Sequence, residues 1–149
     1  HFKDSRLHSA GGAMNRLHGI ITAVESAGHI VLVDVAVNSE IFSAILLEAA
    51  DGERLRPGAE VTLLFKETEV SLAKNLSGLI SLRNRIPARV RAVEKGKVLA
   101  KITLDYRGND IVSVVTTRSA ERLDLQAGDQ VEGLVKANEM TILHQGVLE

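Results

Sequence analysis

The sequence predicts an all-β protein built from two copies of one five-stranded unit. Apolar and polar residues alternate over most of the chain, which is the period of a half-buried strand. Turn-forming residues interrupt these runs, as at Arg56-Pro57-Gly58 and Gln126-Ala127-Gly128. The order of runs and turns in the first half recurs in the second half. These observations together favour tandem small β units.

Five strands are expected in the first copy. The first run carries Leu17, Ile20 and Val24. The remaining runs are Ile30–Val37, Glu40–Leu47, Val61–Lys66 and Val70–Ala73.

The second copy repeats this scheme and adds a helical segment. Its expected strands are Arg85–Glu94, Lys97–Leu104, Asp110–Val115, Val131–Lys136 and Met140–Leu143. Between the third and fourth of these strands, Thr116–Leu123 opens with hydroxyl residues suited to a helix N-cap. A five-stranded unit with a short helix between strands three and four fits an OB-like barrel.

The internal repeat divides the chain. Asn15-Arg16-Leu17 falls on Asn84-Arg85-Ile86 at an offset of 69 residues. After a one-residue insertion the offset becomes 70, and Leu64-Phe65-Lys66 falls on Leu134-Val135-Lys136. We therefore expect a first repeat over residues 14–75 and a second over residues 76–149. Residues 1–13 are expected to be a linker, with a docked arm as the alternative.

Composition limits the possible functions. The chain has 149 residues, of which 25% are charged, and its formal net charge of −1 argues against a dedicated nucleic-acid binder. No apolar run is long enough to span a bilayer, so no membrane partner is expected. The absence of cysteine excludes disulfides, thiolate metal sites and cysteine nucleophiles, and we expect a cytoplasmic protein. Each unit is near the lower size limit for an independent core, which favours a homo-oligomer.

Hydrogen-bond donors that a packed core would not select flank the second unit. Ser81 and Arg83 open it, Thr116 and Ser119 stand at the helix start, and the Lys136-Ala137 pair closes it. Arginine and lysine make charge-assisted hydrogen bonds, which are stronger than neutral ones. Backbone N–H groups at a helix start are free to bind an anion. A small oxyanion without donors of its own needs a site of this kind.

The same residues carry a family resemblance. The second copy resembles the molbindin (Mop) type of TOBE domain. Ser81-Leu82-Arg83-Asn84 matches the opening motif, in which the family usually has Ala at the second place. Thr116 to Gly128 matches the pattern Thr-x-x-Ser-Ala-x-x-Leu-x-Leu-x-x-Gly, and Val135-Lys136-Ala137 matches the closing motif. The resemblance covers about sixty residues strongly, within the size range of a minimal domain, and the remainder weakly through the repeat.

The resemblance implies a ligand and a set of ligand-binding residues. Such barrels bind molybdate or tungstate, and the family's ligand-binding groups fall on Ser81, Arg83, Thr116, Ser119, Lys136 and Ala137. In relatives these groups meet at subunit interfaces, with two chains contributing to one anion. No separate cofactor and no metal ion other than the oxyanion is implied.

Ordinary structural roles remain open for each residue. Arg83 is also suited to a surface ion pair, and Lys136 to protecting a strand edge. Thr116 and Ser119 also suit a helix cap without a ligand. All of these residues fall in the register of one family motif, which favours the binding role.

The first copy lacks most of these groups. Gly12 and Met14 stand at the positions of Ser81 and Arg83, and we align Leu46 and Ala49 with Thr116 and Ser119. Lys66 is retained, but Glu67 replaces Ala137 and brings a negative charge. Because like charges repel, we expect the first repeat to be a structural half that holds no equivalent anion.

Catalysis has no support in the sequence. The histidines show no paired metal-ligand spacing, and no Ser-His-Asp set or phosphate loop is present. We therefore expect a binding protein, either the molybdate-sensing part of a transcription regulator or a storage and homeostasis protein. A start without Met favours the regulator, with a DNA-binding domain upstream, although this segment itself binds no nucleic acid. The alternative is an accessory domain of a transporter ATPase or a ligand-free oligomerisation module.

Overall fold

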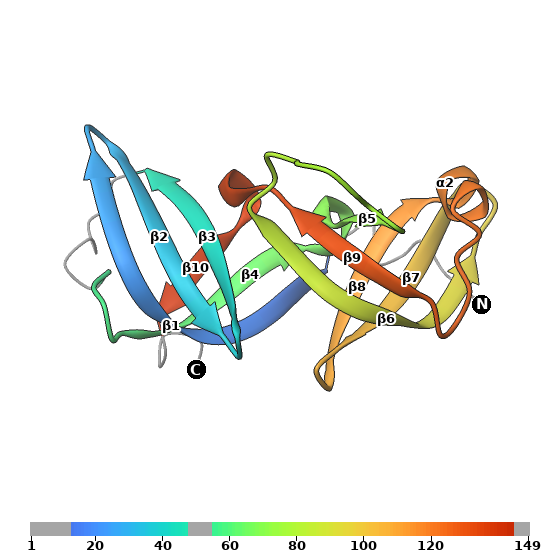
Figure 1. The fold of residues 1–149 in the computed structure, drawn as a ribbon, viewed down its shortest axis with the longest axis horizontal. Helices are drawn as coiled ribbons and strands as arrows, with labels where there is room; N and C mark the ends of the chain where they lie inside the picture. The colour runs from blue at the N-terminus through green and yellow to red at the C-terminus, as the bar shows by residue number, and fades with distance from the viewer. Residues whose placement is uncertain (1–12, 48–54, 145–149) are drawn as a thin grey trace.

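The computed structural model describes residues 13–47 and 55–144, which form two curled five-stranded antiparallel sheets placed end to end (Figure 1). The all-β tandem fold expected from the sequence is confirmed, and the strand runs lie where the alternation predicts them. The elements in chain order are β1 (Met14–Ala27), β2 (Ile30–Val37), β3 (Glu40–Leu47), β4 (Glu60–Lys66), the 3-10 turn η2 (Glu67–Glu69), β5 (Ser71–Ala73), β6 (Asn84–Lys95), β7 (Leu99–Tyr106), β8 (Asn109–Thr116), α2 (Thr117–Arg122), β9 (Gln130–Val135), the 3-10 turn η3 (Ala137–Glu139) and β10 (Thr141–His144).

The expected helix between the third and fourth strands is α2 in the second repeat. Thr116 is its N-cap, in extended backbone conformation, and the Thr116 side chain accepts a hydrogen bond from the Ser119 N–H. The corresponding insertion of the first repeat and most of the expected N-terminal linker lie outside the described residues. Among the described residues, no helix is long and apolar enough to cross a membrane.

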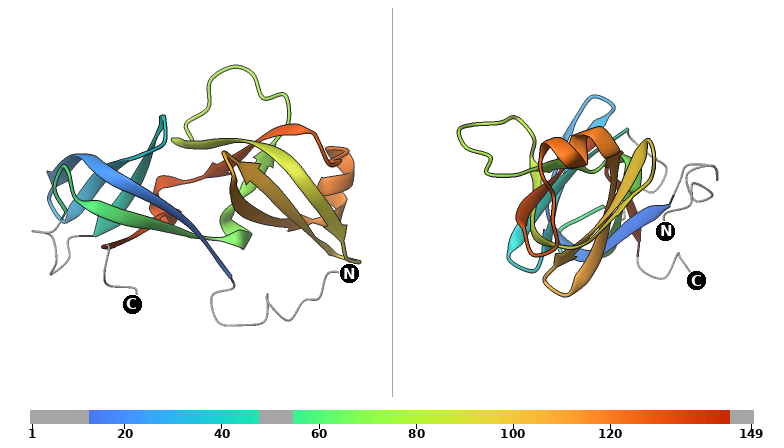
Figure 2. Two further views of the ribbon diagram at one scale, coloured as in Figure 1. Left: turned by 90° about the horizontal axis from the view of Figure 1, so that it is seen from below. Right: turned by 90° about the vertical axis from the view of Figure 1, so that its right-hand side faces the viewer.

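The last strands of the two repeats are exchanged. The first sheet has the order β10-β4-β1-β2-β3 and the second has the order β5-β9-β6-β7-β8. Figure 1 shows β10, from the end of the chain, beside β4, and β5, from the first repeat, beside β9; Figure 2 gives two further views. Each sheet therefore takes four strands from one repeat and its remaining edge strand from the other.

The two repeats fold alike in detail. The pairing of β1 with β2 is interrupted between Ile21 and Ala23, and that of β6 with β7 between Val90 and Ala92, at an offset of 69 residues. The Gly58 N–H donates to the Ile21 carbonyl over 2.8 Å, as the Gly128 N–H does to the Val90 carbonyl over 2.7 Å. Both glycines have positive φ, near 93° and 97°, which favours glycine there. The repeat seen in the sequence is thus also a repeat of backbone irregularities.

A pair of buried asparagines joins the repeats reciprocally. The Asn15 side chain donates to the Val112 carbonyl over 2.9 Å and accepts from the Val112 N–H over 2.8 Å. The Asn84 side chain makes the same two bonds with the Ser43 carbonyl and N–H, over 2.9 and 2.7 Å. Each amide therefore extends the hydrogen bonding of a third strand, β8 or β3, that belongs to the other repeat.

Tyr106 contributes a further contact between the repeats. Its ring is buried, and its hydroxyl donates to Glu40 Oε1 over 2.5 Å, while Arg107 donates to both Glu40 oxygens. Burial and the Glu40 carboxylate raise the pKa of Tyr106 to about 12. This cluster attaches the β7–β8 hairpin to the β2–β3 hairpin, and the buried side chains of both sheets form one continuous core.

Candidate oxyanion-binding site

Four of the six predicted ligand-binding residues lie in one open cavity of about 800 Å³. Ser81 and Arg83 come from the segment before β6, and Lys136 and Ala137 join β9 to η3. Since β6 and β9 are antiparallel neighbours with Asn84 opposite Val135, the residues just before β6 meet those just after β9. Lys136 is exposed, and both Lys136 and Arg83 line this cavity.

The strand ladder opens at this end of the second repeat. In the first repeat, pairing of β1 with β4 continues to Met14 and Lys66, and the Glu67 N–H then donates to the Ala13 carbonyl over 3.0 Å. In the second repeat, pairing of β6 with β9 stops at Asn84 and Val135. Within the described part of the chain, the Ala137 N–H, which corresponds to that of Glu67, has no backbone acceptor. Among the described residues it is thus a backbone donor without a carbonyl partner, next to Lys136.

Two residues of the first repeat, Ser43 and Asp34, contact the Arg83 guanidinium. Its Nε donates to Ser43 Oγ over 3.2 Å, and its terminal nitrogen lies 3.7 Å from Asp34 Oδ1, within ion-pair range. Ser43 in turn donates to Asp34 Oδ1 over 2.6 Å. Asp34 and Ser43 could not be predicted from the sequence, because neither belongs to a motif and both lie about forty residues or more before Arg83. The signal that was available is that both differ from their repeat counterparts, Thr103 and Val112.

The cavity is not composed of donors alone. Glu69 of η2 and Glu139 of η3 also line it, together with Ile45 of β3 and Ser71 of β5. The Glu69 carboxylate accepts from the Lys66 N–H over 3.1 Å, so one of these acids is engaged with the first repeat. The remaining wall residues are Thr68, Leu82, Leu134 and Asn138.

Thr116 and Ser119 do not line this cavity. Thr116 borders a smaller hollow of about 230 Å³ with Lys97, Val98 and Arg118. Ser119 borders a different hollow, of about 200 Å³, beneath α2. Thr116 Oγ1 donates to Ser119 Oγ over 2.9 Å and accepts from the Ser119 N–H over 3.0 Å. A single chain thus brings four of the predicted residues together and leaves the other two at the start of α2.

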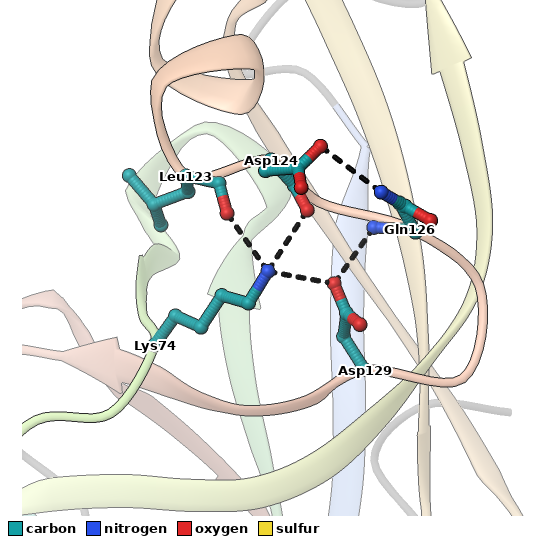
Figure 3. A network of polar contacts seen from close by, with 5 residues as sticks. All are labelled: Lys74, Leu123, Asp124, Gln126 and Asp129. Atoms are coloured by element: carbon teal, nitrogen blue, oxygen red, sulfur yellow. Dashed lines mark hydrogen bonds and ion pairs between the residues drawn. The ribbon is translucent and has the colours of Figure 1, made fainter.

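The C-terminal end of α2 is fastened by a lysine from the first repeat. Lys74, which follows the exchanged strand β5, donates to the Leu123 and Asp124 carbonyls over 2.9 and 2.8 Å, and to Asp129 Oδ2 over 3.0 Å (Figure 3). A cation at the C-terminal end of a helix also interacts favourably with the helix dipole. Lys74 and the Gln126 N–H hold the pKa of Asp129 below its usual range. The helix that carries Thr116 and Ser119 is therefore anchored to both repeats.

The strand register corrects one part of the repeat alignment. Thr116 pairs with Leu99, and the corresponding first-repeat pair is Leu47 with Ile30. The counterpart of Thr116 is therefore Leu47 and not Leu46, because the insertion follows β3 instead of preceding its end. The position aligned with Ser119, at Ala49, lies outside the described residues, as does Gly12.

The chain is similar to several proteins of known type. A family model described as TOBE domain matches residues 13–72 and 80–142. The crystal structure of the cytoplasmic molybdate-binding protein ModG, with molybdate bound, matches with a TM-score of 0.81 and 28% identity, over 86% of this chain and 94% of that one.

Two curated relatives are similar in sequence. The molybdenum import ATP-binding protein ModC of Brucella abortus (strain 2308) is 34% identical over 87% of this chain and 34% of its own length. The molybdenum-pterin-binding protein MopB of Rhodobacter capsulatus is 32% identical over 69% of this chain and 39% of its own length. The chain thus spans about a third of the length of the ModC relative. Because the family model matches both repeats over most of the chain, this protein belongs to the TOBE-domain family.

Proposed function

We propose that this chain binds molybdate or tungstate in the cavity that contains Arg83 and Lys136. The observation that carries the proposal is the open end of the β6–β9 ladder, where two cationic side chains and the Ala137 N–H share one cavity. A tetrahedral dianion has acceptor oxygens only, so cationic donors and an N–H unclaimed by any backbone carbonyl suit it. Ser81 adds a hydroxyl at the same wall.

The similar proteins support the choice of anion. The matching ModG protein is described as molybdate-binding and cytoplasmic. The match covers nearly all of the ModG chain. We propose the same ligand and the same compartment for this chain, as a binding event without turnover and without a separate cofactor. The biological setting is sensing for a regulator or storage. The similarity to ModC keeps an accessory domain of a transporter ATPase as the second candidate.

A second copy of the chain completes the proposed site. Thr116 and Ser119 lie outside the cavity of their own chain, so in this proposal a partner copy supplies its α2 start to Arg83 and Lys136. The first repeat offers an apolar face for the contact. Its exposed members on one face of β1, β2 and β3 are Ile20, Ile30, Ile41, Ile45 and Leu47.

The other repeat lacks such a face. Arg89 and Asp110 replace Ile20 and Ile41 at the corresponding positions, and Arg91 pairs with Asp110 over 3.1 Å. Ile45 also lines the cavity, so the apolar face reaches the proposed anion site. Several exposed apolar residues on one sheet face suit an association surface.

Isothermal titration with molybdate, tungstate and sulfate tests the function. We expect tight binding of the first two oxyanions, and a loss of about 2–5 kcal/mol in Arg83→Ala and in Lys136→Ala. Lys66→Ala, at the equivalent position of the first repeat, is the matched control and should bind as the wild type does. No heat with any oxyanion would contradict the proposal.

Subunit mixing tests the shared site separately. Arg83→Ala and Thr116→Ala should each bind weakly alone. After the two are unfolded and refolded together, some sites combine Arg83 of one copy with Thr116 of the other, and binding should return in part. If mixing restores nothing while both variants remain oligomeric, the two residues do not act across copies.

A further inference from the structure

We propose that Ser43 and Asp34 of the first repeat are positioning residues for Arg83, which make the first repeat part of the anion site. The inference rests on the proposed function, because it concerns how the same cavity holds its ligand. Neither residue lines the cavity; both stand behind the Arg83 guanidinium.

The hydrogen bonds run in one direction. Ser43 has a single hydroxyl proton, which it donates to Asp34 Oδ1 over 2.6 Å. Its oxygen is therefore left to accept from Arg83 Nε, over 3.2 Å. Ser43 satisfies Nε, and one terminal nitrogen lies 3.7 Å from Asp34 Oδ1, beyond hydrogen-bond distance. In this proposal the hydrogen-bonding capacity of the terminal nitrogens is therefore left for an anion in the cavity. Asp34 thus sets the direction of the hydroxyl, and the hydroxyl sets the direction of the arginine.

We call the hydrogen-bonded series Asp34–Ser43–Arg83 the relay; its members differ in how far they are buried. Ser43 is fully buried, and its own backbone is held by the Asn84 side chain through two bonds. The Arg83 side chain is 61% exposed and has few other contacts that could orient it. An exposed arginine loses much rotamer freedom when it binds a ligand, so a fixed acceptor at Nε favours binding by ordering it beforehand.

The first repeat's corresponding end lacks the relay altogether. Met14 stands where Arg83 does, Thr103 where Asp34 does, and Val112 where Ser43 does. The backbone at these positions is the same, since Val112 receives the same two bonds from Asn15 that Ser43 receives from Asn84. All three side chains differ together, which points to one function shared by Arg83, Ser43 and Asp34.

The primary test is Ser43→Ala, assayed by titration with molybdate. This variant keeps both backbone bonds to Asn84 and removes only the hydroxyl, and we expect binding to weaken about tenfold. Ser113→Ala is the control, because Ser113 is equally buried and donates to the Val70 carbonyl over 2.6 Å instead of bonding to Arg83 or Asp34. It should lose stability without losing affinity. Equal affinity in Ser43→Ala and the wild type would overturn the proposal.

A double-mutant cycle identifies the residue through which Ser43 acts. In an Arg83→Ala background, Ser43→Ala should have no further effect; in a Lys136→Gln background its effect should be retained in full. The same weakening in both backgrounds would mean that Ser43 does not act through Arg83. If the wild type fails to bind molybdate, the proposed function itself is wrong, whereas binding that is sensitive to Arg83 but not to Ser43 rejects only the relay.

Two further measurements separate the roles of the carboxylate and the hydroxyl. Asp34→Asn retains an oxygen that can accept from Ser43 and should bind at least as tightly as the wild type, because a negative charge near the dianion is lost. Weakening as large as in Ser43→Ala would show that the charge of Asp34 holds Arg83 and would overturn the relay. Without ligand, the Arg83 Nε–H resonance should exchange faster with water in Ser43→Ala and be unchanged in Ser113→Ala.

Discussion

The two repeats have equivalent strand ends, but the strand pairing continues at one end and stops at the other. Both ends have a buried asparagine that bonds to the third strand of the other repeat, and both pass from a lysine into a 3-10 turn. At the first end the ladder closes as far as Glu67, which is buried. At the second end it stops at Asn84 and Val135, and Arg83, Lys136 and Ala137 face an open cavity.

This difference shows how two repeats of one fold present a closed strand ladder at one end and an open polar cavity at the other. Two of the differences lie at the ladder itself: loss of the last cross-strand bonds, and Arg83 and Ala137 in place of Met14 and Glu67. The first frees backbone donors, and the second exchanges an apolar and an acidic side chain for a cation and a small residue. The closed repeat still contributes Ser43 and Asp34 to the open one.

Converting the open end to the closed end should have the largest effect. Ala137→Glu gives the second repeat the residue of the first, and it brings a carboxylate to the place of a dianion. Like charges at an interface cost several kcal/mol, so we expect molybdate affinity to fall by about a hundredfold or more. Ala137→Gln, of equal size and neutral, should retain far more affinity in the same titration. Equal affinities in the two variants would contradict the electrostatic reason.

Substitutions of Asn15 and Asn84 should both lower stability but differ in their effect on molybdate binding. Asn84→Ala strands the buried N–H and carbonyl of Ser43, and Asn15→Ala strands the partly buried N–H and carbonyl of Val112. We expect each to lower the free energy of unfolding by about 2–4 kcal/mol in denaturant titrations. Only Asn84→Ala should also weaken molybdate binding, since it holds Ser43 beside Arg83. A similar loss of affinity in Asn15→Ala would mean that the ends are not functionally distinct.

Alkaline pH should weaken the contact between the two repeats at Tyr106, a residue of the second repeat. Tyr106 is the single tyrosine of the chain, and its counterpart in the first repeat is Val37. Because folding raises its pKa from 10.0 to about 12, its contribution is fully present below pH 10 and is lost as the pH rises towards 12. The loss should reach about 2–3 kcal/mol. Absorbance of the phenolate, followed in folded and denatured protein, measures both pKa values directly, and Tyr106→Phe should lack this pH dependence.

Removing the lysine that anchors α2 should have the smallest effect. Lys74→Met leaves the Leu123 and Asp124 carbonyls without their cationic donor. We expect faster amide hydrogen exchange at the end of α2, with the sheets unaffected. Since Lys74 lowers the pKa of Asp129, the difference from the wild type should be present above the usual carboxyl range and shrink as the pH falls through that lowered value. An unchanged exchange rate would contradict an anchoring role.

The strands, and four of the residues that line the candidate cavity, could be predicted from local sequence. Alternation placed the strands within a few residues, and the motifs around Arg83 and Lys136 are short enough to be read directly. The exchange of β5 and β10 did not follow, because alternation fixes which side chains face inward and says nothing of the neighbouring strand. Asp34 and Ser43 reach Arg83 through that cross-repeat packing. The predicted alignment of Leu46 with Thr116 is wrong, because sequence identity does not locate the insertion between the repeats.

Anomalous diffraction from crystals grown with molybdate tests the central claim most directly, because the metal itself is located. The account predicts a molybdenum peak within hydrogen-bonding reach of Arg83, Lys136 and the Ala137 N–H, with the Thr116 hydroxyl of a second copy on its far side. A peak beside Lys66 and Glu67 instead, or an empty cavity at Arg83 in crystals that hold molybdate elsewhere, would contradict it.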